Sequence, residues 1–227
     1  METQQSNRIQ TSILNGVERK ALIWLAEREP AWVSSDMLTL VGSIGALTVA
    51  AGFILSNLNI LYLWLAILGL IINWYGDSLD GSLARVRHAQ RPRYGFFVDH
   101  MVDCFNETAI FVGVGLSPLV SFDLALLVLV FYFQLSIYVF ISTHLKGEFK
   151  LTYAKLGPTE FRLLGIVVIA LIMYVTPIRT FTFHSLSIFD IVAVILIVVL
   201  AIMFVVSFLT DAREYAKMEP LKRNGEK

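Results

Sequence analysis

Four aspartates between residues 77 and 103 have the types and spacing that metal chemistry needs. Asp77 and Asp80 are three residues apart, and Asp99 and Asp103 are four apart. On two helices each pair would lie on one face, so the four carboxylates could meet between the helices. The flanking sequence is apolar, and carboxylates near hydrocarbon are costly unless cations or water satisfy them. We therefore expect a hard divalent cation at this cluster.

Two residues beside the acids bear on the kind of metal. His100 and Cys104 each follow one of the aspartates directly, but neighbouring side chains on a helix diverge by about 100°. The pattern therefore favours an all-oxygen site for Mg²⁺ or Mn²⁺ over a zinc site. Cys104 is the single cysteine, and we expect it to be a packing residue. In the alternative interpretation, the acids form structural ion pairs with basic residues such as Arg85.

Eight positions of this stretch resemble the signature of the CDP-alcohol phosphotransferases, D-x2-D-G-x2-A-R-x8 or 9-G-x3-D-x3-D. They are Asp77, Asp80, Gly81, Ala84, Arg85, Gly95, Asp99 and Asp103. A match at eight spaced positions is far more specific than a lone glycine motif. The resemblance implies a bundle of six transmembrane helices, in which two metal ions bind the pyrophosphate of a CDP-linked donor.

The resemblance also implies a role for each acidic residue. By the resemblance, the metal ligands would be Asp77, Asp80, Asp99 and Asp103, which would hold two ions of Mg²⁺ or Mn²⁺. Asp103 would in addition be the general base on the acceptor hydroxyl. Two metals that share carboxylates can clamp the attacking and leaving oxygens of a phosphoryl transfer.

The small and basic residues of the signature have two interpretations each. By the resemblance, Gly81 and Ala84 belong to the cytidine site, and Arg85 can donate to phosphate oxygens. Taken alone, Gly81 and Ala84 would be equally well explained by close helix packing, and Arg85 by a topology or lipid-headgroup role. We expect Gly95 to permit close packing at the start of its helix.

The composition places the chain in a membrane. Of the 227 residues, 56% are hydrophobic and only 16% are charged, with a mean hydropathy of +0.69. These values predict an integral membrane protein. The formal net charge is zero, so nothing indicates a nucleic-acid partner. We expect no cleavable signal, because the first thirty or so residues lack an apolar core.

Six apolar segments follow the polar start, and each is close to the length of about 20 residues that crosses a bilayer. They run approximately over 37–56, 60–84, 95–117, 122–145, 159–177 and 187–210. We predict an all-α integral membrane protein, with a six-helix domain over 36–217 and a cytosolic tail over 218–227. Residues 1–35 predict an amphipathic helix that either lies at the membrane interface or packs on the cytosolic end of the bundle.

Basic residues predict the orientation. They precede the first segment, occupy the second and fourth links and fill the tail, whereas only Arg179 falls on the opposite side. The positive-inside rule then places both termini and the acidic cluster in the cytosol. A soluble nucleotide and a lipid could both reach such a shallow site. The small single bundle resembles prokaryotic members of the family, so we expect an inner or plasma membrane.

The fourth link is the other informative stretch. Gly157, Pro158, Thr159, Glu160 and Arg162 could simply begin a helix, with Pro and an acid suited to its first turn. The family's acceptor pocket lies near this link, and the G-x-x-E pattern is weakly similar to inositol-phosphate and amino-alcohol transferases. The basic residues around it could neutralise a phosphorylated acceptor or serve topology alone. They are Lys146, Lys150, Lys155 and Arg162.

The leading hypothesis is an enzyme of phospholipid biosynthesis. It would transfer a phosphatidyl group from CDP-diacylglycerol to a small alcohol and release CMP. An alternative keeps the same site and transfers a CDP-linked head group to a lipid alcohol. The alternative from another functional class is a divalent-cation transporter. Such a protein would be expected to carry polar residues through the whole bundle, whereas here the acids gather at one face. The sequence leaves open the acceptor, the choice between Mg²⁺ and Mn²⁺, and the oligomeric state, a homodimer included.

Overall fold

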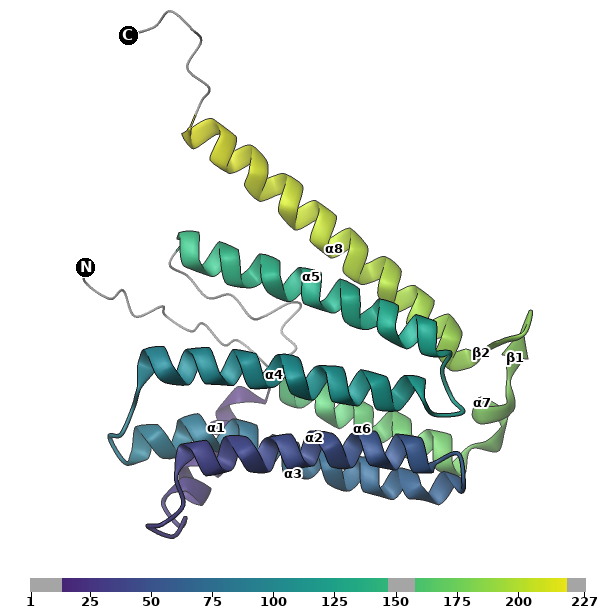
Figure 1. Ribbon diagram of the computed structural model, residues 1–227, viewed down its shortest axis with the longest axis horizontal. Helices are drawn as coiled ribbons and strands as arrows, with labels where there is room; N and C mark the ends of the chain where they lie inside the picture. Colours follow the sequence, from purple (N-terminus) through teal and green to yellow (C-terminus); the bar gives the residue numbers. More distant parts are fainter. Residues whose placement is uncertain (1–13, 147–157, 220–227) are drawn as a thin grey trace, which may run out of the picture.

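The fold of the chain is known from a computed structural model that describes residues 14–146 and 158–219. The described part is almost entirely helical (Figure 1). Its helices are α1 (Asn15–Ala26), α2 (Ser35–Leu55), the 3₁₀ turn η1 (Ile60–Tyr62), α3 (Leu63–Val86), α4 (Pro92–Gly115), α5 (Phe122–Lys146), α6 (Pro158–Tyr174), α7 (Thr176–Thr180) and α8 (Ile188–Met218). Strands β1 (Thr182–Phe183) and β2 (Leu186–Ser187) form a small antiparallel hairpin before α8.

Local sequence explains where the helices begin. The Ser34 hydroxyl accepts a hydrogen bond from the Met37 N–H and so caps α2. Pro92 opens α4 at a position where a missing N–H costs nothing. At α8, Ser187 and Asp190 bond each other's backbone N–H groups in a reciprocal capping box. These features set where α2, α4 and the long last helix begin.

Glycines bring α2 and α3 into direct backbone contact. A Cβ atom added to Gly76 would lie 2.2 Å from the Gly42 nitrogen, and one added to Gly45 would lie 2.3 Å from the Asn73 nitrogen. No larger side chain fits at either position without moving a helix. The two helices therefore lie side by side along their length (Figure 1). This close pair forms the wall that carries Asp77 and Asp80.

Two clusters of buried apolar side chains hold the helices at either end of this wall. One joins α2, α3 and α6, with Val49, Leu63, Ala66 and Ile172 among its members. The other joins α1 to α2 and α3 near the acidic residues, and Leu79 in it is fully buried. The acidic stretch of α3 is thus anchored against α1 and α2.

The chain is an all-α membrane protein, although the prediction of six spans is tested only in part. Four described helices have the length and composition to cross a bilayer, namely α2, the run from η1 through α3, α5 and α8. Helices α4 and α6 match the other two predicted segments, but α4 carries the acids and α6 has only 17 residues. That they cross the membrane stays a prediction.

The last helix is longer than its apolar segment predicted. It continues from Ile188 to Met218 and lies beside α5 (Figure 1). Its polar end is held because the buried Asp211 carboxylate accepts hydrogen bonds from Tyr138, Ser142 and Lys146 on α5. The hydropathy pattern ended at residue 210 because it detects apolar surface and not these side-chain bonds.

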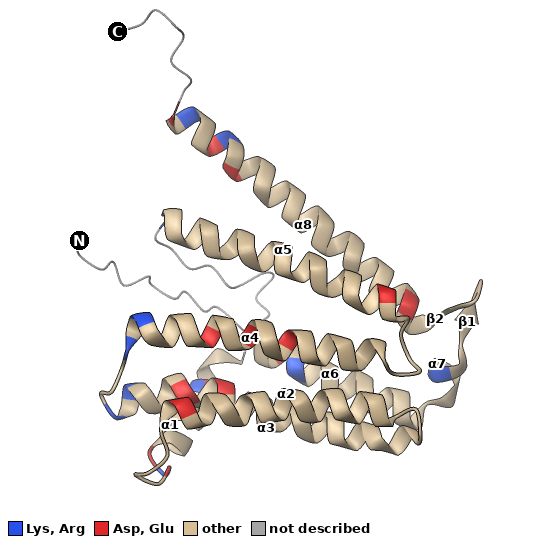
Figure 2. Cartoon of the chain, viewed as in Figure 1, with Lys and Arg blue, Asp and Glu red and all other residues tan. Residues whose placement is uncertain are grey.

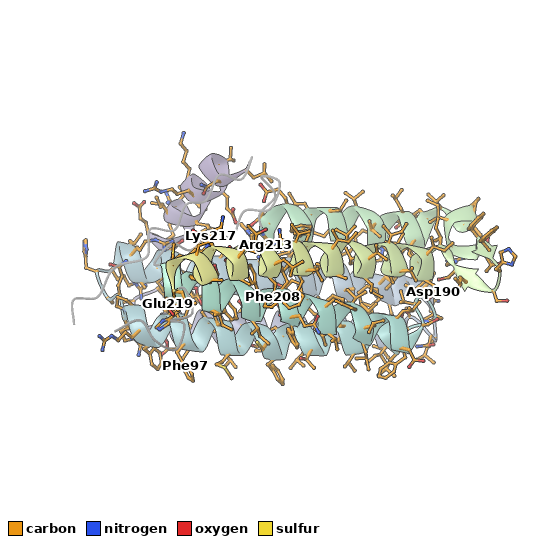
Figure 3. All side chains as sticks on the ribbon, turned by 90° about the horizontal axis from the view of Figure 1, so that it is seen from above. Phe97, Asp190, Phe208, Arg213, Lys217 and Glu219 are labelled. Carbon is orange, nitrogen blue, oxygen red and sulfur yellow. The ribbon has the colours of Figure 1, made fainter. Side chains whose placement is uncertain are left out.

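Charged residues are distributed unevenly along the bundle. In Figure 2 the Lys and Arg residues of α3, α4 and α8 gather at one end, and the arginine of α7 lies at the other. Figure 3 shows the same polarity along α8, with Asp190 at one end and Arg213, Lys217 and Glu219 at the other. By the positive-inside rule, this asymmetry predicts that the end rich in Lys and Arg faces the cytosol, and the orientation stays a prediction.

Candidate phosphoryl-transfer site

A cavity of about 1210 Å³ opens among helices α1 to α6. All the signature residues line it. They are Asp77, Asp80, Gly81, Ala84, Arg85, Gly95, Asp99 and Asp103. Apolar side chains from α3, α4 and α5 line other parts, including Leu70, Ile110 and Phe140. The cavity therefore offers both a polar wall and an apolar one.

Three of the four aspartates converge as the spacing predicted. Carboxylate oxygens of Asp77, Asp99 and Asp103 all lie within 4.8 Å of one another. Asp77 comes from α3 and the other two from successive turns of α4. An all-oxygen set of this kind fits Mg²⁺ or Mn²⁺, and these residues would hold such an ion.

The fourth aspartate lies on the same wall but is bonded differently. The Asp80 carboxylate accepts a hydrogen bond of 2.7 Å from the Thr39 hydroxyl of α2 and a further one from the Gly81 N–H. The Ser35 hydroxyl of α2 also donates to the Asp80 backbone carbonyl, at 3.0 Å. Helix α2 contributes no acid to the cluster, yet it fixes the orientation of this carboxylate.

One arginine lies at the acidic cluster although sequence spacing gave no reason to expect it there. Arg162 on α6 donates from Nη2 to the Asp77 carboxylate at 2.5 Å and from Nε to Asn73 Oδ1 at 3.1 Å. It also interacts electrostatically with Asp103 and Glu107. The cluster thus contains one fixed positive charge in addition to any bound cation.

The other basic residues of the fourth link are placed differently. Lys146 forms ion pairs with Asp211 at 2.8 Å and Glu214 at 3.0 Å and does not line the cavity. Lys150 and Lys155 lie outside the described residues. Among the described residues of this set, Arg162 is therefore the one that an anionic ligand in the cavity could meet.

The glycines of the signature border open space. The nearest atom to a Cβ added at Gly81 is Nη1 of Arg85, at 3.5 Å, and a Cβ at Gly95 meets nothing within 4 Å. The expectation that Gly95 permits close helix packing is therefore wrong, because no neighbouring helix approaches it. The Arg85 guanidinium donates to the Ser82 hydroxyl at 2.9 Å and lines the cavity beside Gly81.

His100 lies closer to its neighbouring acid than helix geometry predicted, with 3.8 Å between His100 Nδ1 and Asp99 Oδ2. The His100 ring packs against Phe96, with centroids 4.1 Å apart, and against Phe140 at 4.7 Å. Its Nδ1 lies 2.7 Å from the Phe96 carbonyl. Glu107 extends the acidic face of α4 by one turn and interacts with Tyr132 of α5 at the cavity wall.

Helix α1 connects the cavity wall to the start of α6. The Glu18 carboxylate accepts hydrogen bonds from the Trp74 indole, at 3.1 Å, and from the Thr159 hydroxyl. In return, Glu160 Oε1 accepts a hydrogen bond from the Leu14 N–H just before α1, at 3.0 Å, and Glu160 also lines the cavity. Packing of α1 on the bundle was one of the two predicted alternatives. A location at the membrane interface stays a prediction.

The link between α3 and α4 is also held electrostatically. Arg91 forms an exposed ion pair with Asp36 at the start of α2, with 2.5 Å between Nη2 and Oδ1. This hydrogen bond raises the pKa of Arg91 above its ordinary value. Arg87 donates to three backbone carbonyls ahead of α2, those of Glu29, Pro30 and Val33. These contacts join the link between α3 and α4 to the start of α2 and the residues before it.

The sequence was compared with models of known protein families. The model described as CDP-alcohol phosphatidyltransferase matches residues 32–206, which include α2 to α6 and most of α8. The chain belongs to this family. The match covers more than half of the chain, from just before α2 to within α8.

Two curated relatives are similar to part of this chain. A phosphatidylinositol phosphate synthase of Cutibacterium acnes is 36% identical over 88 residues, which is 38% of this chain and 39% of the relative. An archaetidylinositol phosphate synthase of Pyrococcus horikoshii is 28% identical over 104 residues, or 46% of this chain and 52% of the relative. The matched segments thus span about half or less of each relative.

Proposed function

We propose that this CDP-alcohol phosphatidyltransferase transfers a phosphatidyl group from CDP-diacylglycerol to a small polar alcohol and releases CMP. The observation that carries the proposal is the convergence of Asp77, Asp99 and Asp103 in a cavity lined by the whole family signature. Divalent cations, when bound, neutralise the pyrophosphate and stabilise the oxygen that leaves.

Each signature residue has a proposed task in that reaction. Asp77, Asp99 and Asp103 hold the cations, and Asp80 joins them with its carboxylate oriented by Thr39. Gly81 and Ala84 leave room for the cytidine moiety, and Arg85 donates to the phosphates. The apolar part of the cavity wall accepts the start of the acyl chains.

Asp103 is the proposed general base. It takes the proton from the acceptor hydroxyl as that oxygen bonds to the phosphorus that carries diacylglycerol. The pyrophosphate bond to that phosphorus breaks, and CMP leaves with the bonding electrons. Asp103 is on the same face of α4 as Asp99, so the base lies beside the carboxylates that position the phosphate.

The acceptor that the cavity supports best is a phosphorylated polyol such as an inositol phosphate. Both similar relatives are named as phosphatidyl- or archaetidylinositol phosphate synthases. Arg162 supplies a fixed positive charge at the acidic cluster, where it would face an acceptor phosphate beside Asp103. An uncharged acceptor would gain no charge–charge attraction from Arg162, whose role would then be limited to its ion pair with Asp77.

We place this reaction at the cytosolic face of the membrane. The acidic cluster lies toward the end of the bundle at which Lys and Arg residues of α3, α4 and α8 gather (Figure 2). CDP-linked donors and phosphorylated alcohols are both polar and would reach the cavity from that side.

The test is a CMP-release assay on the purified full chain. It compares CDP-diacylglycerol with CDP-linked head groups as donors, and inositol phosphate with inositol and glycerol phosphate as acceptors. We expect release that requires CDP-diacylglycerol, a phosphorylated polyol and Mg²⁺ or Mn²⁺, and that stops in excess EDTA. Full activity in EDTA would contradict the metal site. Turnover with free inositol as fast as with its phosphate would contradict the proposed acceptor.

A further inference from the structure

Asn73 is a buried polar residue to which the proposed chemistry assigns no task. It lies on α3 one turn before Asp77, and only 7% of its surface is exposed. A buried amide in an apolar span is costly unless both its ends are hydrogen-bonded. Here Nδ2 donates to the Gly42 carbonyl of α2 at 3.0 Å, and Oδ1 accepts from Arg162 Nε at 3.1 Å.

The bond to α2 depends on the glycine contact between the helices. An asparagine side chain is short, so it reaches a backbone carbonyl of the next helix only where the two backbones nearly touch. Gly42 and Gly45 provide that approach, since a Cβ at Gly45 would lie 2.3 Å from the Asn73 nitrogen itself. The amide is therefore held where the backbones of α2 and α3 are in direct contact.

The other end of the amide orients a guanidinium. Nε and Nη2 of Arg162 are occupied by Asn73 and Asp77, and two in-plane contacts determine the plane of a rigid fork. Its remaining N–H groups have no protein acceptor among residues 14–146 and 158–219, and Arg162 lines the cavity. With Nε free, the same guanidinium could rotate away from Asp77 or pair with Glu107.

We propose that Asn73 is a positioning residue. It fixes the Arg162 guanidinium on the Asp77 carboxylate, so that this cation lowers the affinity of the acidic cluster for a divalent metal. The same contact aims the free guanidinium donors at an anionic acceptor, a second effect that rests on the proposed function. The first effect does not, because it concerns the substrate-free protein alone.

The primary test measures Mn²⁺ binding to the purified, substrate-free chain by electron paramagnetic resonance. Removing a unit positive charge beside a divalent cation should tighten binding, so Arg162→Gln should bind Mn²⁺ about tenfold more tightly. Asn73→Leu should tighten it about threefold, because the guanidinium remains but is no longer fixed. The double variant should bind no more tightly than Arg162→Gln alone, since the two residues act through one contact.

Other outcomes would overturn the proposal. If the increases in Mn²⁺ affinity of the two single variants multiply in the double variant, Asn73 acts independently of Arg162. Weaker Mn²⁺ binding in Arg162→Gln would show that the guanidinium supports the metal ligand and does not compete. Neither result bears on whether the enzyme makes a phosphatidyl alcohol, so failure here is separate from failure of the proposed function.

A matched control and a second variant complete the test. The Asn57 amide also bonds another helix, because Nδ2 donates to the Leu116 carbonyl at 2.8 Å as well as to that of Ile54 at 2.9 Å. Asn57 follows the end of α2 opposite to Thr39, so Asn57→Leu should leave Mn²⁺ affinity unchanged. Arg162→Lys keeps the charge but has no Nε for Asn73. It should bind Mn²⁺ as Asn73→Leu does and raise KM for the phosphorylated acceptor more than KM for the donor. If Arg162→Lys equals wild type both in Mn²⁺ affinity and in KM for the phosphorylated acceptor, orientation by Asn73 is refuted. This test holds even if Asn73→Leu fails to fold.

Discussion

Gly76→Ala tests whether the direct contact of α2 and α3 positions the metal ligands. The added methyl would lie 2.2 Å from the Gly42 nitrogen and 2.4 Å from the Leu38 carbonyl oxygen, and both are backbone atoms. Because ordinary contacts are about 3.5 Å, the helices would have to separate by about 1 Å. Asp77 follows Gly76 directly and would move with it.

Two opposing terms set the size of the effect. Alanine favours the helix by about 1 kcal/mol relative to glycine, whereas forcing a methyl into a tight interior costs about 1–3 kcal/mol or more. Since the clashing atoms are backbone, we take the upper end and expect a net loss of about 2 kcal/mol in unfolding free energy. A shift of about 1 Å in a catalytic group can lower the rate by about 10²-fold, so CMP release should fall by that order.

Gly95→Ala is the matched control for this substitution. It adds the same methyl to a signature glycine on the neighbouring helix, but nothing lies within 4 Å of the new Cβ. Stability of substrate-free protein in detergent, measured by thermal unfolding, should be unchanged or raised by up to about 1 kcal/mol. The reasoning is refuted if Gly76→Ala is as stable as wild type, or if Gly95→Ala loses as much stability as Gly76→Ala.

Two further predictions concern the acids and the orientation. Asp103→Asn should lower single-turnover transfer by about 10²- to 10⁴-fold while donor binding survives, whereas Asp77→Asn should weaken donor binding and recover partly at high Mn²⁺. Equal loss of donor binding in both variants would remove the general base from Asp103. A cysteine placed at His88, in the link between α3 and α4, should react with membrane-impermeant reagents only from the cytosolic side. Labelling of intact cells from outside would reverse the topology.

Sequence spacing was sufficient to predict the part of the site that depends on one helix alone. The intervals between Asp77 and Asp80 and between Asp99 and Asp103 place each pair on one helix face, whatever the rest of the chain does. The helices also followed from hydropathy, because each apolar run must satisfy its own backbone in a membrane. What spacing could not provide is which carboxylates meet. In the structure Asp80 turns to Thr39, and the other three converge.

The contacts that the sequence did not reveal all join distant segments. Arg162 reaches Asp77 across 85 residues, and Glu18 reaches Thr159 across 141. Neither pair has a periodic signal, because the pairing depends on how α1 and α6 pack against α3. A weaker signal was present for Asn73, a lone amide within an apolar segment one turn before a proposed metal ligand. Such a residue must have a buried partner, although its sequence position does not say which.

Helix α2 shows how much of the site depends on a helix that contributes none of the four signature aspartates. Gly42 and Gly45 let its backbone reach α3, its Gly42 carbonyl holds Asn73, and its Thr39 holds Asp80. One face of α2 thus orients two of the four proposed ligands, Asp80 directly and Asp77 through Asn73 and Arg162. Because hydrogen bonds are short and directional, a shift of α2 by a fraction of an ångström would disturb both ligands together. We therefore expect substitution of the small and hydroxyl residues of this helix to disturb Asp77 and Asp80 as well.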